Sequence, residues 1–292
     1  QLMSQWKAWI LAARPKTLPA AIVPVWSGSL LAYEQTGIIQ LRQALLTVFG
    51  AIFIQVATNF FNDVIDSQKG ADTGERVGPQ RATVSGLLTP RAVYFGAFLM
   101  LILASLCGWF LFQARGWPIL LIGIPSLYLS FGYTGGPFPL AYRGMGELFV
   151  ILFFGLVAVG GTVFVQTGLW TPESLILGFQ IGLLSAVLIA VNNYRDVSED
   201  APAEKLTLAV RFGRPLVRYL IIGMTLMPAM LILCHSEYSL AWFLPALGAA
   251  LLFVILELKF LRPDGVPSSL LGLSALHLIL FVSLQNFAMS LT

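Results

Sequence analysis

Long apolar runs recur from one end of the chain to the other, and they restrict the fold more than any other feature. A helix needs roughly 20 apolar residues to cross the hydrocarbon core of a bilayer. Only 11% of the residues are charged, against roughly 25% in soluble domains. Because the runs are continuous rather than alternating, they predict helices and not a barrel. The sequence therefore predicts an all-α, polytopic membrane protein that lies in a lipid bilayer and takes no nucleic-acid partner.

We predict a single integral-membrane domain over 1–292, a bundle of nine transmembrane helices whose two halves, about 1–140 and 141–292, each hold one acidic stretch. The predicted spans are 18–35, 43–66, 91–113, 117–134, 147–167, 172–196, 215–234, 238–260 and 268–290. A short amphipathic piece, Trp6 to Ala13, precedes the first span and is expected to lie in the membrane interface. The oligomeric state stays open.

The distribution of basic residues predicts the orientation. Cytoplasmic loops of membrane proteins carry an excess of Lys and Arg. With the N-terminus in the cytoplasm, 15 of the 17 Lys and Arg residues face the cytoplasm, and Arg42 and Arg115 face the other side. The C-terminus then faces outside, and both acidic stretches lie on the cytoplasmic side. We therefore predict a multi-pass protein of a bacterial-type cytoplasmic (inner) membrane, with its active site facing the cytoplasm.

The two acidic stretches are NFFNDVIDSQKGAD at 59–72 and NNYRDVSED at 192–200, and each follows an apolar run. Spacings of three and four place their Asn and Asp side chains on one face of a helix. Oxygen ligands without His or Cys suit a hard cation, Mg²⁺ or as a substitute Mn²⁺, and Mg²⁺ usually also takes substrate phosphates. The predicted metal ligands are Asn62, Asp63, Asp66, Asp72, Asn192, Asp196 and Asp200.

Basic residues follow each acidic stretch, and they suit a diphosphate. Arg binds phosphate oxygens in a bidentate manner, whereas Lys acts as a point charge. The predicted diphosphate-binding residues are Lys69, Arg76, Arg81, Lys205 and Arg211; weaker substrate-binding candidates are Arg14, Lys16, Asn59 and Tyr133.

Two other interpretations of the acidic stretches are open. Acidic residues at helix ends are commonly solvated surface charge, but two similar clusters on one membrane face, each opened by Asn and followed by basic residues, favour a binding site. A cation-coupled transporter also binds ions at carboxylates and often contains two repeats. Against it, these acids lie at the ends of predicted helices beside phosphate-suited basic residues, not at the middle of the membrane.

The two acidic motifs resemble those of a known enzyme family. N-D-x-x-D at 62–66 and N-N-x-R-D-x-x-x-D at 192–200 resemble the paired aspartate motifs of the UbiA superfamily of intramembrane prenyltransferases. The resemblance extends to ARPKTLP at 13–19, YTGGPFPLAYRGMGE at 133–147 and KLTLAVRFG at 205–213. RVGPQR at 76–81, the doubled Asn and the T-L-x-V-R-x-G tail resemble the 1,4-dihydroxy-2-naphthoate branch of the superfamily. The chain departs from the pattern at Glu204, where the family often has Gly before the lysine.

The resemblance implies an Mg-dependent transferase of menaquinone biosynthesis. A polyprenyl group would pass from polyprenyl diphosphate to 1,4-dihydroxy-2-naphthoate with loss of CO₂ and diphosphate, and demethylmenaquinone would form. Metal ions and basic residues would stabilise the departing diphosphate, and Tyr133 would contact the allylic cation through its ring. The implied catalytic residues are Asp63, Asp66, Asp72, Asp196 and Asp200. Another aromatic acceptor, or a phytyl donor, is the alternative within enzymes. The length of the prenyl chain is left open.

Overall fold

The structure is a computed structural model that describes residues 5–70, 82–234, 240–262, 266–267 and 269–289. Within these ranges the chain is helical and contains no strand, which confirms the all-α prediction. The elements are α1 (Gln5–Ala13), η1 (Pro15–Thr17), α2 (Pro19–Thr36), α3 (Leu41–Gln68), α4 (Pro90–Arg115), α5 (Pro118–Gly132), η2 (Leu140–Arg143), α6 (Gly146–Val150), η3 (Ile151–Val157), α7 (Ala158–Thr167), α8 (Pro172–Arg195), α9 (Val197–Asp200), α10 (Leu208–Leu231), η4 (Ile232–Cys234), α11 (Leu240–Phe260) and α12 (Ser269–Met289).

Several helices begin where the local sequence favours a start. Thr89 accepts a hydrogen bond from the backbone N–H of Ala92 and precedes Pro90, the first residue of α4. Thr171 and Ser174 form a reciprocal capping box at the start of α8, whose first residue is again a proline. Proline suits this position because the first N–H groups of a helix have no partner within the helix.

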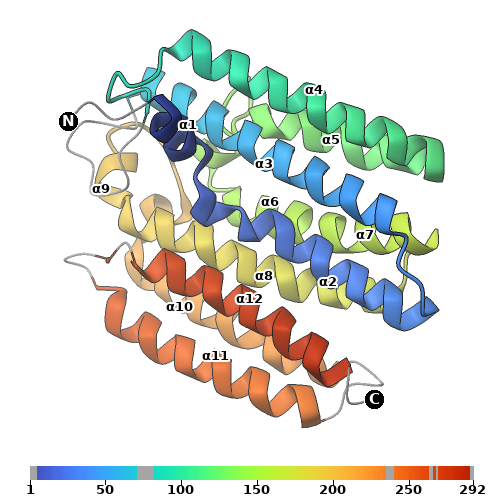
Figure 1. Ribbon diagram of the computed structural model, residues 1–292. Coiled ribbons are helices and arrows are strands. Elements are labelled where there is room, and N and C mark those ends of the chain that lie inside the picture. Colours follow the sequence, from blue (N-terminus) through green and yellow to red (C-terminus); the bar gives the residue numbers. More distant parts are fainter. Residues whose placement is uncertain (1–4, 71–81, 235–239, 263–265, 268, 290–292) are drawn as a thin grey trace.

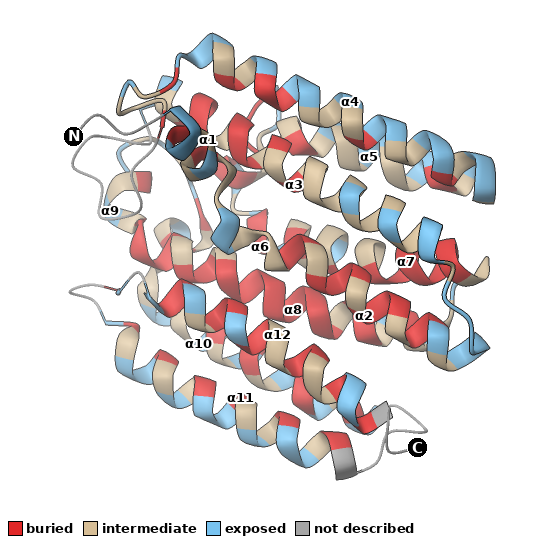
Figure 2. Cartoon of the chain, viewed as in Figure 1, coloured by how far each residue is buried: buried red, intermediate tan, exposed pale blue. Residues whose placement is uncertain are grey.

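The long helices run roughly parallel, with their connections gathered at two ends of a bundle (Figure 1). α8 lies at the centre and is the helix on which buried residues are most concentrated, whereas α4 and α11 expose one face (Figure 2). One apolar cluster joins α2, α7, α8, α10, α11 and α12, and another joins α1, α3 and α4. The bundle therefore has a largely apolar interior around α8 and a wide apolar surface.

Each predicted span overlaps a helix, but the structure supports the membrane assignment for fewer of them. Within the described part of the chain, seven helices are long and apolar enough to cross a membrane. The two predicted spans that lack this support correspond to α2 and α5. α5 is a shorter apolar helix of 15 residues, and α2 ends in the polar run Tyr33 to Thr36. The seven helices identify a multi-pass membrane protein.

Three glycines bring the π-helix η3 against α8. A β-carbon added to Gly155 would lie 2.3 Å from the carbonyl oxygen of Gly178 and 2.6 Å from Cα of Gly182. Both atoms belong to the backbone of α8, so neither can turn aside. Small residues commonly permit such close approach between membrane helices, and a π-helical segment changes the direction of the side chains that follow it. This contact fixes the position of η3 relative to α8.

We expect Gly155→Ala to destabilise the protein by about 3 kcal/mol, because over-packing typically costs 1–3 kcal/mol and here the added methyl meets backbone. Thermal unfolding in detergent measures the change. Gly223→Ala is the matched control, since a β-carbon at Gly223 meets nothing within 4 Å. Equal unfolding temperatures for the two variants would contradict the close packing.

Candidate active site

The predicted site residues that the structure describes lie mainly at one end of the bundle. α3 ends there with the first acidic stretch, α8 and α9 supply the second, and the segment 133–145 crosses between them. Leu206 donates its N–H to the carbonyl oxygen of Tyr142 at 3.2 Å, which joins this segment to the chain after α9. The two acidic stretches, about 130 residues apart in sequence, are therefore held at the same end.

Asp66 is a central residue of this site. Its side chain is buried, and Oδ1 accepts a hydrogen bond from the Tyr142 hydroxyl at 2.8 Å. Its other oxygen, Oδ2, lies 3.9 Å from Nζ of Lys205. The same ammonium lies 3.3 Å from Oδ1 of Asp200. Lys205 therefore joins one carboxylate from each acidic stretch, and the paired arrangement predicted from the sequence is present for Asp66 and Asp200.

The Asp200 carboxylate is suited to bind a cation. Oδ2 of Asp200 is enclosed and has no hydrogen-bond partner among the described residues. Burial raises the pKa of Asp200 to about 6, although the nearby Lys205 ammonium acts in the opposite direction. A buried carboxylate needs a counter-charge to stay ionised at neutral pH. Lys205 supplies only part of that charge, because it is shared with Asp66.

Lys69 and Tyr142 complete this part of the site. Nζ of Lys69 donates to the carbonyl oxygen of Thr134 at 2.9 Å and lies 4.0 Å from the centre of the Tyr142 ring. Nζ of Lys205 lies 5.9 Å from the same ring. A cation within about 6 Å of a ring centre is attracted to its face. Tyr142 thus sets the positions of both lysines and of Asp66, a role that sequence reasoning did not assign to it.

The donor set fits a hard divalent cation. No three His, Cys, Asp or Glu residues of the described ranges are grouped as a ready metal centre. Mg²⁺ does not need such a group, because it usually takes one or two carboxylates together with water and substrate phosphates. Asp66 and Asp200 offer two carboxylates around one ammonium, and one of their oxygens lacks a partner. Predicted residues Asp72, Arg76 and Arg81 lie outside the described residues.

Asn62 and Asp63 bond to residues on neighbouring segments. Oδ2 of Asp63 accepts hydrogen bonds from the backbone N–H and the hydroxyl of Thr83. The Asn62 carbonyl accepts a hydrogen bond from the hydroxyl of Thr134. These bonds fasten the segments after α3 and α5 to the last turns of α3. Both side chains belong to the predicted ligand set, and in the structure they also hold the walls of the site.

The second acidic stretch continues across a break between α8 and α9. The N–H of Asp196 bonds to the carbonyl oxygen of Asn192 at 2.9 Å, and that of Asp200 bonds to the carbonyl oxygen of Asp196 at 2.8 Å. The helical spacing is therefore kept, as the sequence predicted. The Asp196 carboxylate accepts two hydrogen bonds from Arg195, at 2.5 and 2.9 Å. Asn192 is partly exposed on the last turn of α8.

The segment after α1 is held against α3 by Asn59. Its amide nitrogen donates to the carbonyl oxygen of Ala13 at 2.8 Å and to the hydroxyl of Thr17 at 3.0 Å. Between these two residues Arg14 adopts a left-handed backbone conformation, with φ of 50°. Non-glycine residues adopt this conformation rarely. Asn59 thus holds the backbone on either side of Arg14, whereas Lys16 is exposed.

Glu204 occupies the position before the lysine where the family often has Gly, and its backbone conformation explains that preference. Its φ is 55°, in the left-handed region where glycine has no steric penalty. Lys205 follows directly and reaches Asp66 and Asp200. The positive φ explains why a glycine suits this position, and the chain makes the same turn with Glu. Arg211, further along, is exposed and donates from Nε to the carbonyl oxygen of Leu206 at 3.0 Å.

Tyr133 is buried at the site, where its hydroxyl lies close to Gly146 at the start of α6. Tyr133 shares an apolar cluster with Tyr142, whose hydroxyl bonds to Asp66. The Tyr133 ring lies 5.2 Å from the ring of Phe149. The sequence named Tyr133 as a weaker substrate-binding candidate, and the structure places it between the Tyr142 cluster and Phe149.

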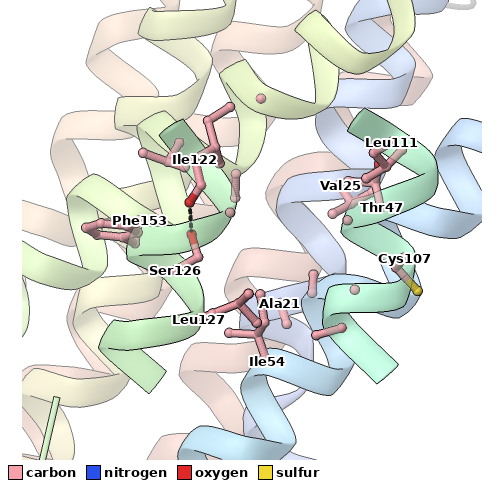
Figure 3. A pocket seen from close by; sticks show the side chains of 18 of the residues that line it. Ala21, Val25, Thr47, Ile54, Cys107, Leu111, Ile122, Ser126, Leu127 and Phe153 are labelled. Carbon is pink, nitrogen blue, oxygen red and sulfur yellow. Dashed lines mark hydrogen bonds between the residues drawn. The ribbon is translucent and has the colours of Figure 1, made fainter. Parts of the chain in front are cut away.

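An apolar cavity of about 340 Å³ lies among α2, α3, α4, α5, η3 and α7. Figure 3 shows aliphatic side chains such as Val25, Ile54 and Leu127 around it. At the end towards the site it is lined by Phe149, the neighbour of Tyr133, and by Gln55, which donates to Asn59 at 3.4 Å. The cavity thus begins beside the polar site and extends into the bundle.

The end of this cavity away from the site is lined by apolar side chains. An apolar cluster that includes Leu111, Ile119 and Val165 lies there. Beyond it, Arg115 donates to the carbonyl oxygens of Val165 and Gln166, both at 2.7 Å. Gln40 donates its backbone N–H to the side chain of Gln166 and its side-chain amide to the Gln166 carbonyl oxygen, each at 2.8 Å. We call this set of bonds around Gln166 the Gln166 clamp.

Comparison with known proteins identifies the family of the chain. Residues 21–282 match the family described as the UbiA prenyltransferase family. A 1,4-dihydroxy-2-naphthoate octaprenyltransferase of Haemophilus influenzae is 37% identical over 223 residues, which are 71% of this chain and 70% of the relative. A protein of the same name from Mycobacterium tuberculosis is 37% identical over 222 residues, which are 76% of this chain and 75% of the relative.

The fold has solved counterparts. A UbiA homolog from Archaeoglobus fulgidus bound to DMAPP and Mg²⁺ superposes with a TM-score of 0.69, although only 14% of the residues are identical. The match covers 97% of this chain and 99% of the homolog. The shared fold, the family match across most of the chain and the two relatives lead to one assignment. The chain is a multi-pass membrane enzyme that belongs to the UbiA prenyltransferase family.

Proposed function

We propose that the chain transfers a polyprenyl group from polyprenyl diphosphate to 1,4-dihydroxy-2-naphthoate, with loss of CO₂ and diphosphate, giving demethylmenaquinone. One observation carries the proposal: the pair Asp66–Asp200, joined by Lys205, adjoins an apolar cavity inside a membrane bundle. The charged diphosphate of the substrate would bind at the acidic pair, and its long apolar prenyl tail would lie in the adjoining cavity. The relatives named as octaprenyltransferases of this naphthoate support the choice of acceptor.

The acidic residues would hold the diphosphate through Mg²⁺, or Mn²⁺ as a substitute, which neutralises charge as the diphosphate departs. Asp66 and Asp200 are the ligands that the geometry favours, with Asn62, Asp63, Asp72, Asn192 and Asp196 as further members of the proposed set. Lys69 and Lys205 lie where they can contact phosphate oxygens. Arg76, Arg81 and Arg211 complete the proposed diphosphate-binding set.

The remaining residues act on the tail and on the allylic carbon. The tail would lie in the cavity behind Phe149, where its apolar surface is removed from water. The Tyr133 ring, beside the junction of cavity and acidic pair, is suited to stabilise positive charge on the allylic carbon. The bundle keeps water away from this carbon, so that the acceptor ring and not water reacts with it. Arg14, Lys16 and Asn59 line or support the same end.

We further propose that all nine predicted spans cross the membrane as a single domain, with the N-terminus and the active site on the cytoplasmic side of a bacterial inner membrane. The excess of Lys and Arg at the site end supports this orientation. Both acidic halves contribute to one site through Lys205, which supports a single functional unit. The acidic residues lie at helix ends, and the chain belongs to a prenyltransferase family. For these two reasons we reject the transporter alternative.

The test is an assay of the purified protein with labelled polyprenyl diphosphate, Mg²⁺ and one aromatic acid at a time. We expect a lipid-soluble product and labelled CO₂ from carboxyl-labelled 1,4-dihydroxy-2-naphthoate. Chelation with EDTA should abolish product, and Mg²⁺ or Mn²⁺ should restore it. Product with hydroxybenzoate or homogentisate in place of the naphthoate would overturn the acceptor assignment. Full activity in EDTA would overturn the metal assignment.

A further inference from the structure

Glu147 is a buried carboxylate that the proposed chemistry does not yet use. It lies on the first turn of α6, and only 6% of its surface is exposed. Oε1 accepts a hydrogen bond from the side-chain amide of Asn193 on α8, at 2.9 Å. Oε2 is enclosed and has no hydrogen-bond partner among the described residues. A buried carboxylate oxygen without a donor is costly unless a ligand supplies one.

The surroundings of Glu147 place it at the reacting end of the cavity. A β-carbon added to its neighbour Gly146 would lie 2.9 Å from the Tyr133 hydroxyl oxygen. Tyr133 packs against Phe149, which lines the tail cavity. Tyr133 also shares an apolar cluster with Tyr142, whose hydroxyl bonds to Asp66. Tyr133 therefore separates two acidic positions, one suited to the metal and diphosphate and the other formed by Glu147 and Asn193.

The chemistry of this second position selects its ligand. A carboxylate repels a diphosphate, and Glu147 does not join the other acids in a metal-binding group within the described residues. A carboxylate oxygen accepts hydrogen bonds, and the adjoining walls are aromatic, from Tyr133 and Phe149. The fitting ligand is an aromatic ring that carries a hydroxyl group. The acceptor of the proposed reaction is such a ring.

We propose that Glu147, held by Asn193, binds the prenyl acceptor by accepting a hydrogen bond from a ring hydroxyl at Oε2. This inference rests on the proposed function, because it assigns the acceptor side of the same site. The acceptor ring would lie on the Glu147 side of Tyr133 and the diphosphate on the Asp66 side. The hydrogen bond would orient the ring towards the allylic carbon and exclude aromatic acids that lack a hydroxyl at the matching place.

The chain offers a close control for Glu147. Glu257 on α11 is also buried, its Oε1 accepts a hydrogen bond from Thr225 on α10 at 2.7 Å, and its Oε2 also lacks a partner within the described ranges. Glu257 lies between α10 and α11, and no described residue of these two helices lines the cavity. The two residues thus share burial and an interhelical hydrogen bond, and they differ in location. Comparing them separates acceptor binding from the support of helix packing.

The experiment measures KM for each substrate in Glu147→Gln and in Glu257→Gln. Gln at position 147 can still accept the bond from Asn193, but it presents an amide N–H where Oε2 was. We expect the KM for 1,4-dihydroxy-2-naphthoate to rise about tenfold to a hundredfold in Glu147→Gln, as for loss of a hydrogen bond to a charged group. The KM for polyprenyl diphosphate should stay within about twofold. Glu257→Gln should change neither value.

A second measurement begins with the wild-type protein. The two mono-methyl ethers of the naphthoate are tested as competitive inhibitors of the wild-type protein. The ether that blocks the bonded hydroxyl should bind about tenfold or more weakly than the other, and Glu147→Gln should remove this difference. An unchanged naphthoate KM in Glu147→Gln, or equal binding of both ethers to the wild type, would overturn the inference while leaving the proposed function intact.

Failure of the proposed function gives a different result. If the wild type prenylates another hydroxylated aromatic acid and not the naphthoate, the acceptor assignment fails. In that case the role of Glu147 is judged from the KM of the acceptor that is used, with the same expected rise. Equal KM values in wild type and Glu147→Gln for that acceptor would overturn the role of Glu147 as well.

Discussion

Asp66→Asn should lower kcat for prenyl transfer by about 100- to 1,000-fold, the range found when one preorganised electrostatic group is removed from an active site. Asn keeps the size of the side chain and an oxygen for the Tyr142 hydroxyl, so the fold should survive. It removes the negative charge that faces Lys205 and that would hold the metal. Initial rates with saturating substrates and Mg²⁺ measure the effect.

The control for this variant is Glu173→Gln, which removes one carboxylate at the start of α8, the end of that helix opposite the site. It should retain wild-type kcat. A second readout is the Mg²⁺ requirement, because the Asp66→Asn protein should need a higher Mg²⁺ concentration for half of its own maximal rate. Wild-type turnover by Asp66→Asn would refute the assignment of this carboxylate to the metal.

Lys205→Met should raise the KM for polyprenyl diphosphate by about tenfold to a hundredfold, because a charge-assisted contact to phosphate is lost. It should also strengthen Mg²⁺ binding in the absence of substrate. The ammonium at present lies 3.3 Å from Asp200 and 3.9 Å from Asp66, so its single charge is shared between them. With the ammonium gone, the net negative charge at the pair is larger, which favours a divalent cation. Substrate kinetics and calorimetric titration with Mg²⁺ measure the two effects separately.

Lys259→Met is the control for Lys205→Met. It removes the same positive charge at an exposed residue near the end of α11. It should leave both quantities unchanged. Weaker Mg²⁺ binding by Lys205→Met would mean that Lys205 supports the acidic pair instead of competing with the metal. An unchanged diphosphate KM would exclude Lys205 from phosphate binding.

The fold was predictable because the membrane imposes a simple rule on sequence. Helix positions followed from apolar runs, and every predicted span overlaps a helix. The assignment of spans was less secure for α5, which is short, and for α2, which carries polar residues in its last turn. Length and hydropathy alone do not decide such helices. Their membrane position depends on packing against neighbours, which a single sequence does not contain.

The site was predictable where helical spacing decides the outcome. The spacing of the acids placed Asp66 near the end of α3, and it placed Asp196 and Asp200 one helical turn apart across the α8–α9 break. It did not predict that Thr83 and Thr134 would bond to Asp63 and Asn62. Those partners come from loops, whose course is set by tertiary contacts.

Two further residues show the same limit. Tyr142 reaches Asp66 across 76 positions of sequence, and Asn193 reaches Glu147 across 46. Nothing in the sequence spacing connected Glu147 to Asn193. The signal was present only as a doubled Asn, whose second member lies on a different side of α8 from the first. Pairing across helices becomes visible only once the helices are placed.

The region around the Gln166 clamp bears on how easily protons and ions could leak across the membrane through the protein. A prenyltransferase of this design places a hydrated, charged site and a continuous cavity in a membrane that must hold an ion gradient. A cavity open at both ends would admit water and let protons pass. The apolar cluster of Leu111, Ile119 and Val165 lies at the end of the cavity away from the site, beside the bonds from Arg115 and Gln40 to the Gln166 segment. Water and ions enter such an apolar lining unfavourably, so the side chains that would surround an isoprenoid tail also oppose leakage along it.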